Sequence, residues 1–362
     1  MRRRRFLSRS LPALTGGTAA IVHAPRVIAA PKIRWRMPTA FPATLDVIHG
    51  SAHRLANLVS SMSGGQFQIE VFAAGEIVPA LGVFEACSKG TVEAFMGASY
   101  YWDRQEPANS WFCTVPFGMN PQGMMAWYFQ GGGMKLWEET YAAFGLVPRP
   151  GIPMAPQMAG WFRKKINTVA DFKGLRMRIP GLGGQVVSRI GGTAVLTPAG
   201  EIFSALERGV IDASEWIGPH DDIKLGLQRT ARHYYYPGWH EPGTTLEFTF
   251  NRKAYDALPV EMKQILDQAT AATWALAVPE WEAKNAIALG VLRTQHRADV
   301  EILPLPAQVL RELRKLSADV VRQESEKSPM ARKVYASFTR FQAQVGDWGQ
   351  ISEGAYHRLI VG

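Results

Sequence analysis

Glu215 and Trp216 are the residues whose types and position best suit recognition of a small ligand. They follow a hydrophobic run, Val210 to Ala213, which predicts a strand, and the backbone then turns at Gly218-Pro219. In open α/β sheets, small ligands bind just beyond the carboxyl ends of the strands. One carboxylate and one flat apolar face form a recognition pair, but they do not form a catalytic set.

Arg178 ends a second predicted strand, Leu175 to Ile179. A guanidinium group holds a carboxylate through two parallel hydrogen bonds, which a lysine cannot reproduce. Arg176 alternates with Arg178, so both side chains are expected on one face of the strand. Gln157 is a third candidate, because it is polar within an apolar stretch. Taken alone, Arg178 is more typical of a surface charge, and Gln157 of a loop amide with a local hydrogen bond.

The common catalytic signatures are missing from the sequence: it has no G-x-S-x-G elbow, no H-E-x-x-H and no Walker loop. The glycines from Gly181 to Gly184 resemble a dinucleotide loop, but Val186 stands where the third glycine belongs. That difference favours a tight turn leading into a helix. His240-Glu241 is followed by Pro242-Gly243, which excludes a helical zinc motif.

Cys87 and Cys113 are the two cysteines of the chain. Two thiols alone cannot form a structural zinc site, and no Cys-x-x-Cys occurs. An oxidising compartment would permit a disulfide between them. Two separate buried thiols are an equally good interpretation, because a chain of this length does not need a crosslink.

Strands and helices alternate along the chain, so the candidate residues belong to an α/β protein. The N-terminal part predicts a strand at 33–37, a helix at 44–62, a strand at 67–71, a helix at 80–89 and a strand at 94–96. The middle predicts a capped turn at 168–172, strands at 175–179, 194–196 and 209–216, and helices at 183–190 and 201–208. This order predicts a mostly parallel sheet with helices on both faces.

Two α/β units with a hinge and a cleft fit this pattern better than one sheet. A long helix is expected from Glu261 into the 280s, bent at Pro279, and a helical tail over Val320 to Tyr356. No low-complexity linker separates the units, so we expect the chain to cross between them more than once. The predicted limits are 31–155 plus 244–283 for the first domain, 156–243 plus 284–325 for the second, and 326–362 for a C-terminal extension.

The composition is that of a globular protein with a substantial core. The chain has 362 residues, 47% of them hydrophobic and 20% charged, and a length of this kind favours two domains. The net charge of +9 includes six arginines within the first 30 residues, and the remainder carries only +3. The basic character therefore belongs to the N-terminal segment, and nucleic acid is not indicated as a partner.

Residues 1–30 have the parts of an export signal. The run Arg3-Arg4-Arg5-Phe6-Leu7 resembles the twin-arginine consensus, a short apolar stretch covers 11–22, and small residues at 27–30 offer a cleavage site. The apolar stretch is shorter than the ~20 residues of a membrane helix, so removal is favoured over anchoring. The alternative is a disordered basic tail. The signal predicts export of a folded protein to the periplasm.

Several segments together resemble the extracytoplasmic solute-binding subunits of tripartite ATP-independent periplasmic (TRAP) transporters. The strongest is the run Asp171-Phe172-Lys173-Gly174-Leu175-Arg176-Met177-Arg178-Ile179-Pro180. Glu215-Trp216-Ile217-Gly218-Pro219 and Pro237-Gly238-Trp239-His240-Glu241 resemble the subgroup that binds 2-oxo acids and related small carboxylates. Further similar segments are Val115 to Met119, Gly131 to Gly133, Gly160 to Arg163, and Ala205 to Gly209.

This resemblance implies two α/β domains joined by crossing strands, a long helix that spans both, and a cleft that ligand closes. It also implies that Arg178 grips the substrate carboxylate. The aromatic pair Tyr100-Tyr101 is expected to line the wall of the first domain.

The resemblance further implies a cation, Na⁺ or Ca²⁺, beside the substrate. Its ligands would be Gln157, Glu215 and the main-chain oxygen of Trp216, with Glu241 as a candidate further acid. A 2-oxo or 2-hydroxy acid presents two oxygens suited to a hard cation. Without a cation, Glu215 would repel the substrate's negative charge.

The expected function is therefore the cation-assisted binding of a small organic acid and its delivery to TRAP membrane permease subunits. The alternative is an exported metal-dependent enzyme acting on a small carboxylate in the same cleft, because metal ions also activate water. Against it stands the lack of a general base paired with a nucleophile.

A homodimer is expected through the C-terminal segment. Val334, Phe338 and Phe341 recur at helical spacing, and Trp348 extends the apolar stripe. In the subgroup's extended-tail members, which this tail resembles, the helix packs against a partner subunit. The alternative is packing on the protein's own second domain.

Overall fold

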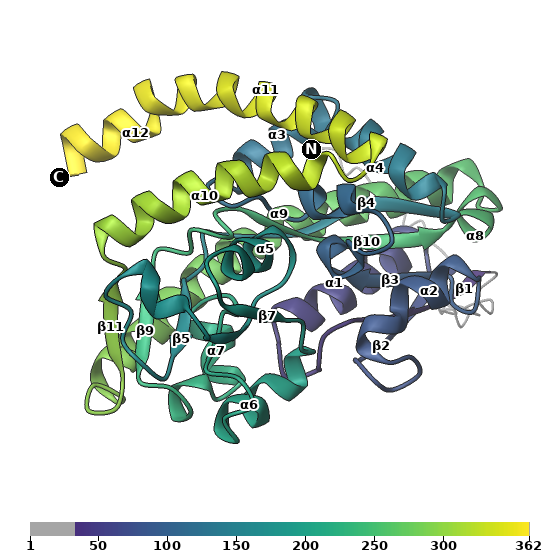
Figure 1. Cartoon of the computed structure of the whole chain (residues 1–362). Helices are drawn as coiled ribbons and strands as arrows, with labels where there is room; N and C mark the ends of the chain where they lie inside the picture. The colour runs from purple at the N-terminus through teal and green to yellow at the C-terminus, as the bar shows by residue number, and fades with distance from the viewer. Residues whose placement is uncertain (1–32, 362) are drawn as a thin grey trace, which may run out of the picture.

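The computed structural model describes residues 33–361, and Figure 1 shows the arrangement of its helices and strands. The described chain begins with a strand–helix–strand unit made of β1 (Ile33–Pro38), α1 (Ile48–Met62) and β2 (Phe67–Phe72). β1 and β2 are parallel neighbours, which confirms the prediction for this segment. Helix α1 begins later than the predicted Thr44, because the N–H of Leu45 donates to the Pro42 carbonyl and closes a turn.

A three-stranded antiparallel sheet, ordered β3–β10–β4, comes from distant parts of the chain. Every residue of the central strand β10 is buried, as expected where both faces of a strand are covered. Helix α9 packs along β4 and continues without interruption through Pro279. The bounds are β3 Ala94–Gly97, β4 Leu146–Met154, β10 Thr244–Asn251 and α9 Val260–Thr294.

A six-stranded sheet, ordered β11–β9–β5–β8–β6–β7, carries Arg178 at the end of β6 and Glu215 directly after β8. Helices α5, α6 and α7 connect or follow its strands. The strand bounds are β5 Gly160–Phe162, β6 Arg176–Arg178, β7 Thr193–Val195, β8 Ala213–Ser214, β9 His233–Tyr236 and β11 Glu301–Pro304. The helix bounds are α5 Gly181–Arg189, α6 Ala199–Glu207 and α7 Pro219–Lys224.

The prediction of a mostly parallel sheet holds for only part of the structure. Within the six-stranded sheet, β6 is parallel to β7 and β8, and β9 is parallel to β11. Strand β5 is antiparallel to both β8 and β9, and the three-stranded sheet is antiparallel throughout. β5 enters this sheet directly from β4, which belongs to the three-stranded sheet, so β5 is not part of a strand–helix–strand repeat of the kind that makes neighbouring strands parallel.

The strand expected over 209–216 is also much shorter than predicted. Only Ala213 and Ser214 form β8, and Val210 is 56% exposed. The residues after α6 complete the end of that helix instead, because Gly209 has a φ of 68° and the Val210 N–H donates to the Ala205 carbonyl. The start of the apolar run that predicted a strand therefore forms the C-terminal end of helix α6.

The chain passes between the two larger sheets more than once. It leaves β4 at Met154 and enters β5 at Gly160, and it returns from β9 at Tyr236 to β10 at Thr244. Helix α9 then packs against α1, β4 and α7, so it contacts elements of both parts. The precise domain limits given above remain a prediction.

The C-terminal part forms two long helices, α10 (Ala307–Ser325) and α11 (Pro329–Ile351). Helix α11 packs against α3 (Pro121–Gln130) and α4 (Gly133–Ala142), and Figure 1 shows α11 along the top of the view with α10 below it. Val334 and Phe338 are fully buried, and the Phe338 ring lies 5.2 Å from that of Trp127 on α3. Phe341 is partly buried against the same core. These residues are therefore covered by the chain's own first part, and not by a partner subunit or by the predicted second domain.

The end of the tail has a different environment. Trp348 is 67% exposed, and the exposed apolar side chains continue to the end of the described chain. They are Trp348, Ile351, Tyr356, Leu359, Ile360 and Val361. They lie at the end of α11, on α12 (Glu353–Tyr356) and on a π-helical turn, His357–Val361.

The remaining helices are short. They are the 3₁₀ helices η1 Ala80–Gly82, η2 Ser99–Trp102, η3 Pro107–Phe112, η4 Val169–Phe172 and η5 Leu227–Arg229, with α2 Val83–Ser88 and α8 Arg252–Asp256. The capped turn predicted at 168–172 is present as η4, with Thr168 and Asp171 forming a reciprocal capping box.

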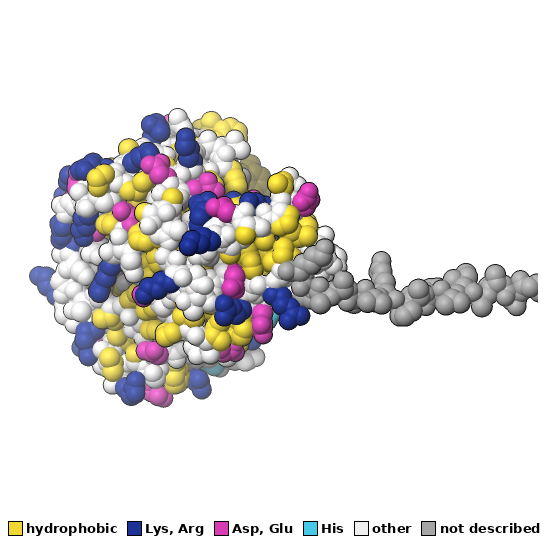
Figure 2. Space-filling model, turned by 90° about the vertical axis from the view of Figure 1, so that its right-hand side faces the viewer, with side chains coloured by type: hydrophobic (Ala, Val, Ile, Leu, Met, Phe, Trp, Pro, Cys, Tyr) yellow, Lys and Arg dark blue, Asp and Glu magenta, His cyan; other side chains and the backbone are white. Residues whose placement is uncertain are grey.

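Cys87 and Cys113 are both buried free thiols, so the interpretation as two separate cysteines was correct. Within residues 33–361, no helix combines the length and the apolar character needed to cross a membrane. On the face shown in Figure 2, Lys and Arg side chains are interspersed with Asp, Glu and apolar ones. The export signal predicted for residues 1–30 lies outside the described residues.

Candidate ligand-binding site

Arg178 and Glu215 meet at the carboxyl ends of two neighbouring parallel strands. β6 ends with Arg178, which is aligned with Ser214 at the end of β8. The N–H of Glu215 donates to the Arg178 carbonyl at 3.2 Å and continues the pairing by one residue. The sequence placed each of these residues at the end of a strand, and parallel strands bring their carboxyl ends to one edge.

The Arg178 guanidinium is 1% exposed and has several partners. Its Nη1 forms an ion pair with Glu215 Oε1, Nε donates to the Thr197 carbonyl at 3.2 Å, and Nη2 donates to the Tyr101 hydroxyl at 3.3 Å. Its Cζ lies 5.0 Å from the centre of the Trp216 ring. Arg176 differs completely, since it pairs with Asp212 at the exposed end of the strand. The interpretation of Arg178 as a surface charge is therefore wrong.

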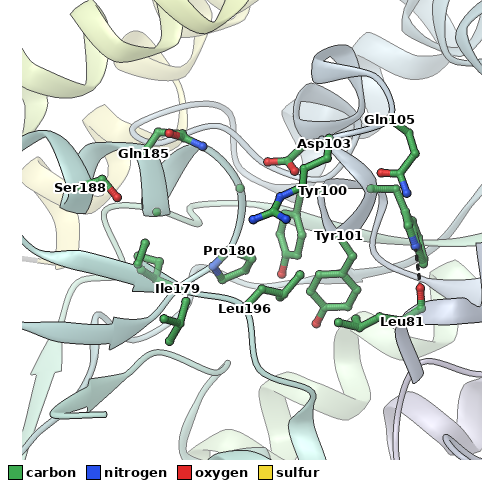
Figure 3. Close-up of a pocket in the computed structure, with 16 residues that line it drawn as sticks. Leu81, Tyr100, Tyr101, Asp103, Gln105, Ile179, Pro180, Gln185, Ser188 and Leu196 are labelled. Carbon is green, nitrogen blue, oxygen red and sulfur yellow. Dashed lines mark hydrogen bonds between the residues drawn. The ribbon is translucent and has the colours of Figure 1, made fainter. Parts of the chain in front are cut away.

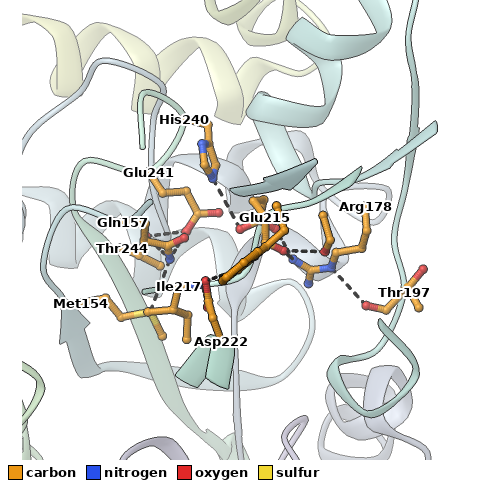
Figure 4. A network of polar contacts seen from close by, with 12 residues as sticks. Met154, Gln157, Arg178, Thr197, Glu215, Ile217, Asp222, His240, Glu241 and Thr244 are labelled. Carbon is orange, nitrogen blue, oxygen red and sulfur yellow. Dashed lines mark hydrogen bonds and ion pairs between the residues drawn. The ribbon is translucent and has the colours of Figure 1, made fainter. Parts of the chain in front are cut away.

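A second polar group faces this pair across the site (Figure 4) and is built on Gln157 and Glu241. Gln157 Nε2 donates to Glu241 Oε2 at 2.8 Å, and the Thr244 hydroxyl donates to the same oxygen at 2.5 Å. The backbones are also joined, because the Gln157 N–H donates to the Glu241 carbonyl and the Gly238 N–H donates to the Gln157 carbonyl. A Cβ on Gly238 would lie 2.3 Å from that carbonyl oxygen, so this close approach requires glycine.

His240 connects the two groups, and sequence reasoning missed it. Its Nε2 lies 3.4 Å from Glu215 Oε2, and Figure 4 shows Glu215 between His240 and Arg178. Ligand atoms of Glu215, His240 and Glu241 all lie within 4.8 Å of one another. Excluding a helical zinc motif was correct, but a loop can also bring ligands together. The available signal was the position of His240 directly before Glu241.

Burial sets the charge of these groups. Burial raises the pKa of Glu215 to about 7, although the charge of Arg178 opposes this change. Burial also raises the pKa of Glu241 to about 7, with a further contribution from Glu215. Burial lowers the pKa of His240 to about 4, so its ring is neutral at physiological pH and does not compensate the acids. Burial would lower the pKa of Arg178, but the charge of Glu215 raises it, and the guanidinium stays charged.

Several buried polar atoms of this cluster have no hydrogen-bond partner among the described residues. They are Gln157 Oε1, Glu215 Oε2 and both ring nitrogens of His240. Buried polar atoms normally have partners, and two carboxylates beside an amide oxygen are the donor set of a hard cation. The residues present therefore fit a cation such as Na⁺ or Ca²⁺.

The aromatic candidates form the wall next to Arg178. Trp216 is buried, with its ring against the guanidinium, and Tyr101 accepts a hydrogen bond from Arg178. The Tyr100 and Tyr101 rings lie 5.0 Å apart. Tyr100 also lies against the start of α5. A Cβ on Gly181 would lie 3.1 Å from the Cβ of Tyr100.

A cavity of about 680 Å³ lies beside these tyrosines. Figure 3 shows Tyr100, Tyr101 and Asp103 on one side of it and Pro180 and Gln185 on the other. The first group follows β3 and the second belongs to the start of α5. The cavity therefore separates the two parts of the chain next to the buried polar cluster.

Comparison with known proteins now decides the family. The family described as bacterial extracellular solute-binding protein, family 7, matches residues 40–328. The chain belongs to this family. Family 7 proteins are the solute-binding components of TRAP transporters, and both the fold class and the solute-binding role predicted above are confirmed.

One relative and two solved structures of family 7 are close to this chain. A protein of Nostoc sp., described as a monocarboxylate 2-oxoacid-binding periplasmic protein, is 41% identical and covers 91% of this chain and 89% of its own. A solute-binding protein of Pseudoalteromonas atlantica with bound sodium and pyruvate is 35% identical, with a TM-score of 0.88 and coverage of 91% and 99%. A dimeric one from Bordetella bronchiseptica, with calcium and picolinate, is 35% identical, with a TM-score of 0.87 and coverage of 90% and 96%.

Proposed function

We propose that this family 7 protein binds a small 2-oxo or 2-hydroxy monocarboxylate together with a hard cation and presents it to a TRAP permease. The observation that carries the proposal is the buried arrangement of Arg178 and Glu215 opposite Gln157 and Glu241. A guanidinium suits the carboxylate, and the oxygen atoms without partners suit the cation. The ligands of the Nostoc and Pseudoalteromonas proteins belong to the same chemical class.

Arg178 and Glu215 would exchange partners when ligand enters. Without ligand, Glu215 is the ionic partner that keeps the buried guanidinium paired. With ligand, the substrate carboxylate would take over Arg178, and Glu215 would turn its oxygens to the cation. Tyr101 and Trp216 would keep the guanidinium in place during the exchange.

Gln157, Glu215, the main-chain oxygen of Trp216 and Glu241 are the proposed ligands of the cation. When bound, the cation would supply the positive charge that allows an anion to enter beside two acids. The charges balance with Ca²⁺ if both glutamates are ionised, and with Na⁺ if one keeps its proton. Charge alone therefore does not choose between the two ions.

A ligand-dependent melting screen tests this function. The mature protein, freed of sodium and divalent ions, is melted with pyruvate, lactate and other small carboxylates, each with and without Na⁺ or Ca²⁺. Ligand that binds only the folded state raises the melting temperature. We expect a rise that requires both a 2-oxo or 2-hydroxy acid and a cation. No rise for any combination would contradict the proposed ligand class.

Catalysis is not part of the proposal. The alternative of a metal-dependent enzyme would use the same acids, which lie beside His240 in the described site. Family membership favours binding over catalysis. Incubation with pyruvate and Ca²⁺, followed by NMR of the small molecule, should return the acid unchanged.

The domain limits and the export route belong to the same proposal. We expect residues 31–155 with 244–283, and 156–243 with 284–325, to move as two bodies that close on the ligand at the cavity beside Tyr100. Residues 1–30 would act as a twin-arginine signal, which would place the mature protein in the periplasm beside its permease.

We propose that the C-terminal end forms a homodimer; the Bordetella protein is a dimer in its crystal. Because Val334 and Phe338 are buried within the chain, a truncation before Val320 would uncover Trp127 and damage the core. The informative truncation removes residues 346–362, which carry the exposed apolar side chains from Trp348 onward.

Light scattering at micromolar concentration should show a dimer for the mature protein and a monomer for the chain ending at residue 345. Apolar side chains at a two-fold contact provide the driving force that the truncation removes. Pyruvate binding should persist in the truncated protein. A full-length protein that is monomeric under these conditions would contradict the dimer.

A further inference from the structure

Phe117 is the one non-glycine residue among the described residues that has a positive φ, and its φ is 54°. A bulky side chain rarely adopts a positive φ, and such residues persist where their surroundings hold them. Phe117 lies in the loop between η3 and α3, outside the candidate site. The conformation therefore needs an explanation that the site itself does not give.

Both backbone polar groups of Phe117 are used in contacts with other segments. Its N–H donates to the Trp239 carbonyl at 2.8 Å. Its carbonyl accepts a hydrogen bond from Gln342 Nε2, on helix α11, at 3.1 Å. The two bonds link the C-terminal helix to the residue that precedes His240.

The Phe117 side chain is held as well. The Arg314 guanidinium of α10 lies 4.5 Å from the ring centre, and the Trp239 ring lies 6.0 Å away. The next residue, Gly118, approaches Phe338 of α11, since a Cβ there would lie 3.3 Å from the Phe338 ring. The loop is thus fixed on one side by α10 and α11 and on the other by Trp239.

The segment held by Phe117 carries one proposed cation ligand, Glu241, and its backbone is bonded to a second, Gln157. The Gly238 N–H donates to the Gln157 carbonyl at 2.8 Å, and the Gln157 N–H donates to the Glu241 carbonyl at 3.2 Å. The backbone of this segment also packs tightly on the Phe117 loop further on, because a Cβ on Gly243 would lie 2.5 Å from the Met119 carbonyl oxygen. A shift of Trp239 would therefore move Glu241 and Gln157 together.

We infer that helix α11 braces the ligand site: Gln342 holds Phe117 in its positive-φ conformation, and Phe117 positions the 238–241 segment. Gln342 and Phe117 are positioning residues, because neither contacts the buried polar cluster. The effect on ligand binding rests on the proposed function. The effect of the brace on hydrogen exchange can be measured without any ligand.

Gln342→Ala tests the brace, and Lys333→Ala is the matched control. Lys333 lies on the same helix and forms an exposed ion pair with Glu139, which contributes little to stability. In the ligand-free protein, we expect Gln342→Ala to speed hydrogen exchange of residues 237–244 by about tenfold, since local opening sets the exchange rate. With Ca²⁺ present, we expect pyruvate binding to weaken about three- to tenfold, as for loss of one hydrogen bond. Lys333→Ala should change neither.

Phe117→Gly separates bracing from general stability. Glycine adopts a positive φ without strain, so a glycine at 117 does not need Gln342 to hold it. In the Phe117→Gly background, Gln342→Ala should therefore weaken binding less than about twofold, a non-additive result typical of coupled residues. Equal losses in both backgrounds, or exchange in Gln342→Ala equal to that in Lys333→Ala, would overturn the brace. If the wild type binds no pyruvate, the exchange experiment still decides the brace, and only the proposed function fails.

Discussion

Replacing Glu215 with Gln should abolish high-affinity binding of pyruvate, with a loss of about a hundredfold or more. Changes to residues that merely support metal ligands cost roughly 10–100-fold, so loss of a charged ligand should cost at least as much. Glu215 is fully buried and combines an ion pair to Arg178 with an oxygen that has no hydrogen-bond partner within residues 33–361. Calorimetry of the variant in Ca²⁺ and in Na⁺ measures the effect. Removing both ions from the wild type should have the same consequence.

Glu247→Gln is the matched control for this change. Glu247 is also a fully buried glutamate, but it accepts hydrogen bonds from Tyr141 and Thr249 in β10, away from the cluster. Burial raises the pKa of Glu247 to about 8, so an amide resembles its neutral form. The control should keep wild-type affinity. Equal affinities of Glu215→Gln and wild type would remove Glu215 from the site.

Arg178→Lys should weaken binding at least about tenfold, whatever the cation. Charge-assisted hydrogen bonds contribute roughly 1.5–3 kcal/mol, and a lysine keeps the charge but loses the paired geometry. Lysine also lacks the separate Nε and Nη2 donors through which Arg178 bonds Thr197 and Tyr101. The dissociation constant for pyruvate in saturating Ca²⁺ measures the change.

Arg149→Lys controls for the loss of a paired arginine elsewhere. Arg149 is partly buried and bonded to Asp267 and Glu138, neither of which belongs to the ligand cluster. Its replacement should lower the melting temperature without changing pyruvate affinity. If Arg178→Lys also lowers only the melting temperature, Arg178 has a structural role and does not hold the carboxylate.

The meeting of Arg178 and Glu215 could be predicted from the sequence because it depends on local order. Each residue ends a strand, and parallel strands place such ends side by side. Gln157 stood out as a polar residue in an apolar stretch, but its place beside Glu241 could be proposed only through the family resemblance, because their contact joins loops that are 84 residues apart. His240 was missed because it belongs to a turn with no periodic pattern, and a search for helical spacing does not detect loop ligands.

The errors in the fold have similar physical causes. Strand β5 has three residues, too few to show a pattern, and its antiparallel direction follows from where the chain enters the sheet. The apolar stripe of α11 correctly indicated a buried face. It could not indicate what covers that face, and the cover is Trp127 of the same chain. A hydrophobic pattern specifies burial, whereas the partner depends on tertiary structure.

The most direct test of the account is calorimetric titration of pyruvate into the mature protein freed of bound ligand and cations. The titration is run in a buffer without sodium or divalent ions, and repeated with Na⁺ and with Ca²⁺. The account predicts saturable binding of one pyruvate per chain when at least one of these ions is present, and no measurable binding without them. The same affinity in all three buffers would show that Arg178 holds the acid without a cation, and would contradict the proposed site.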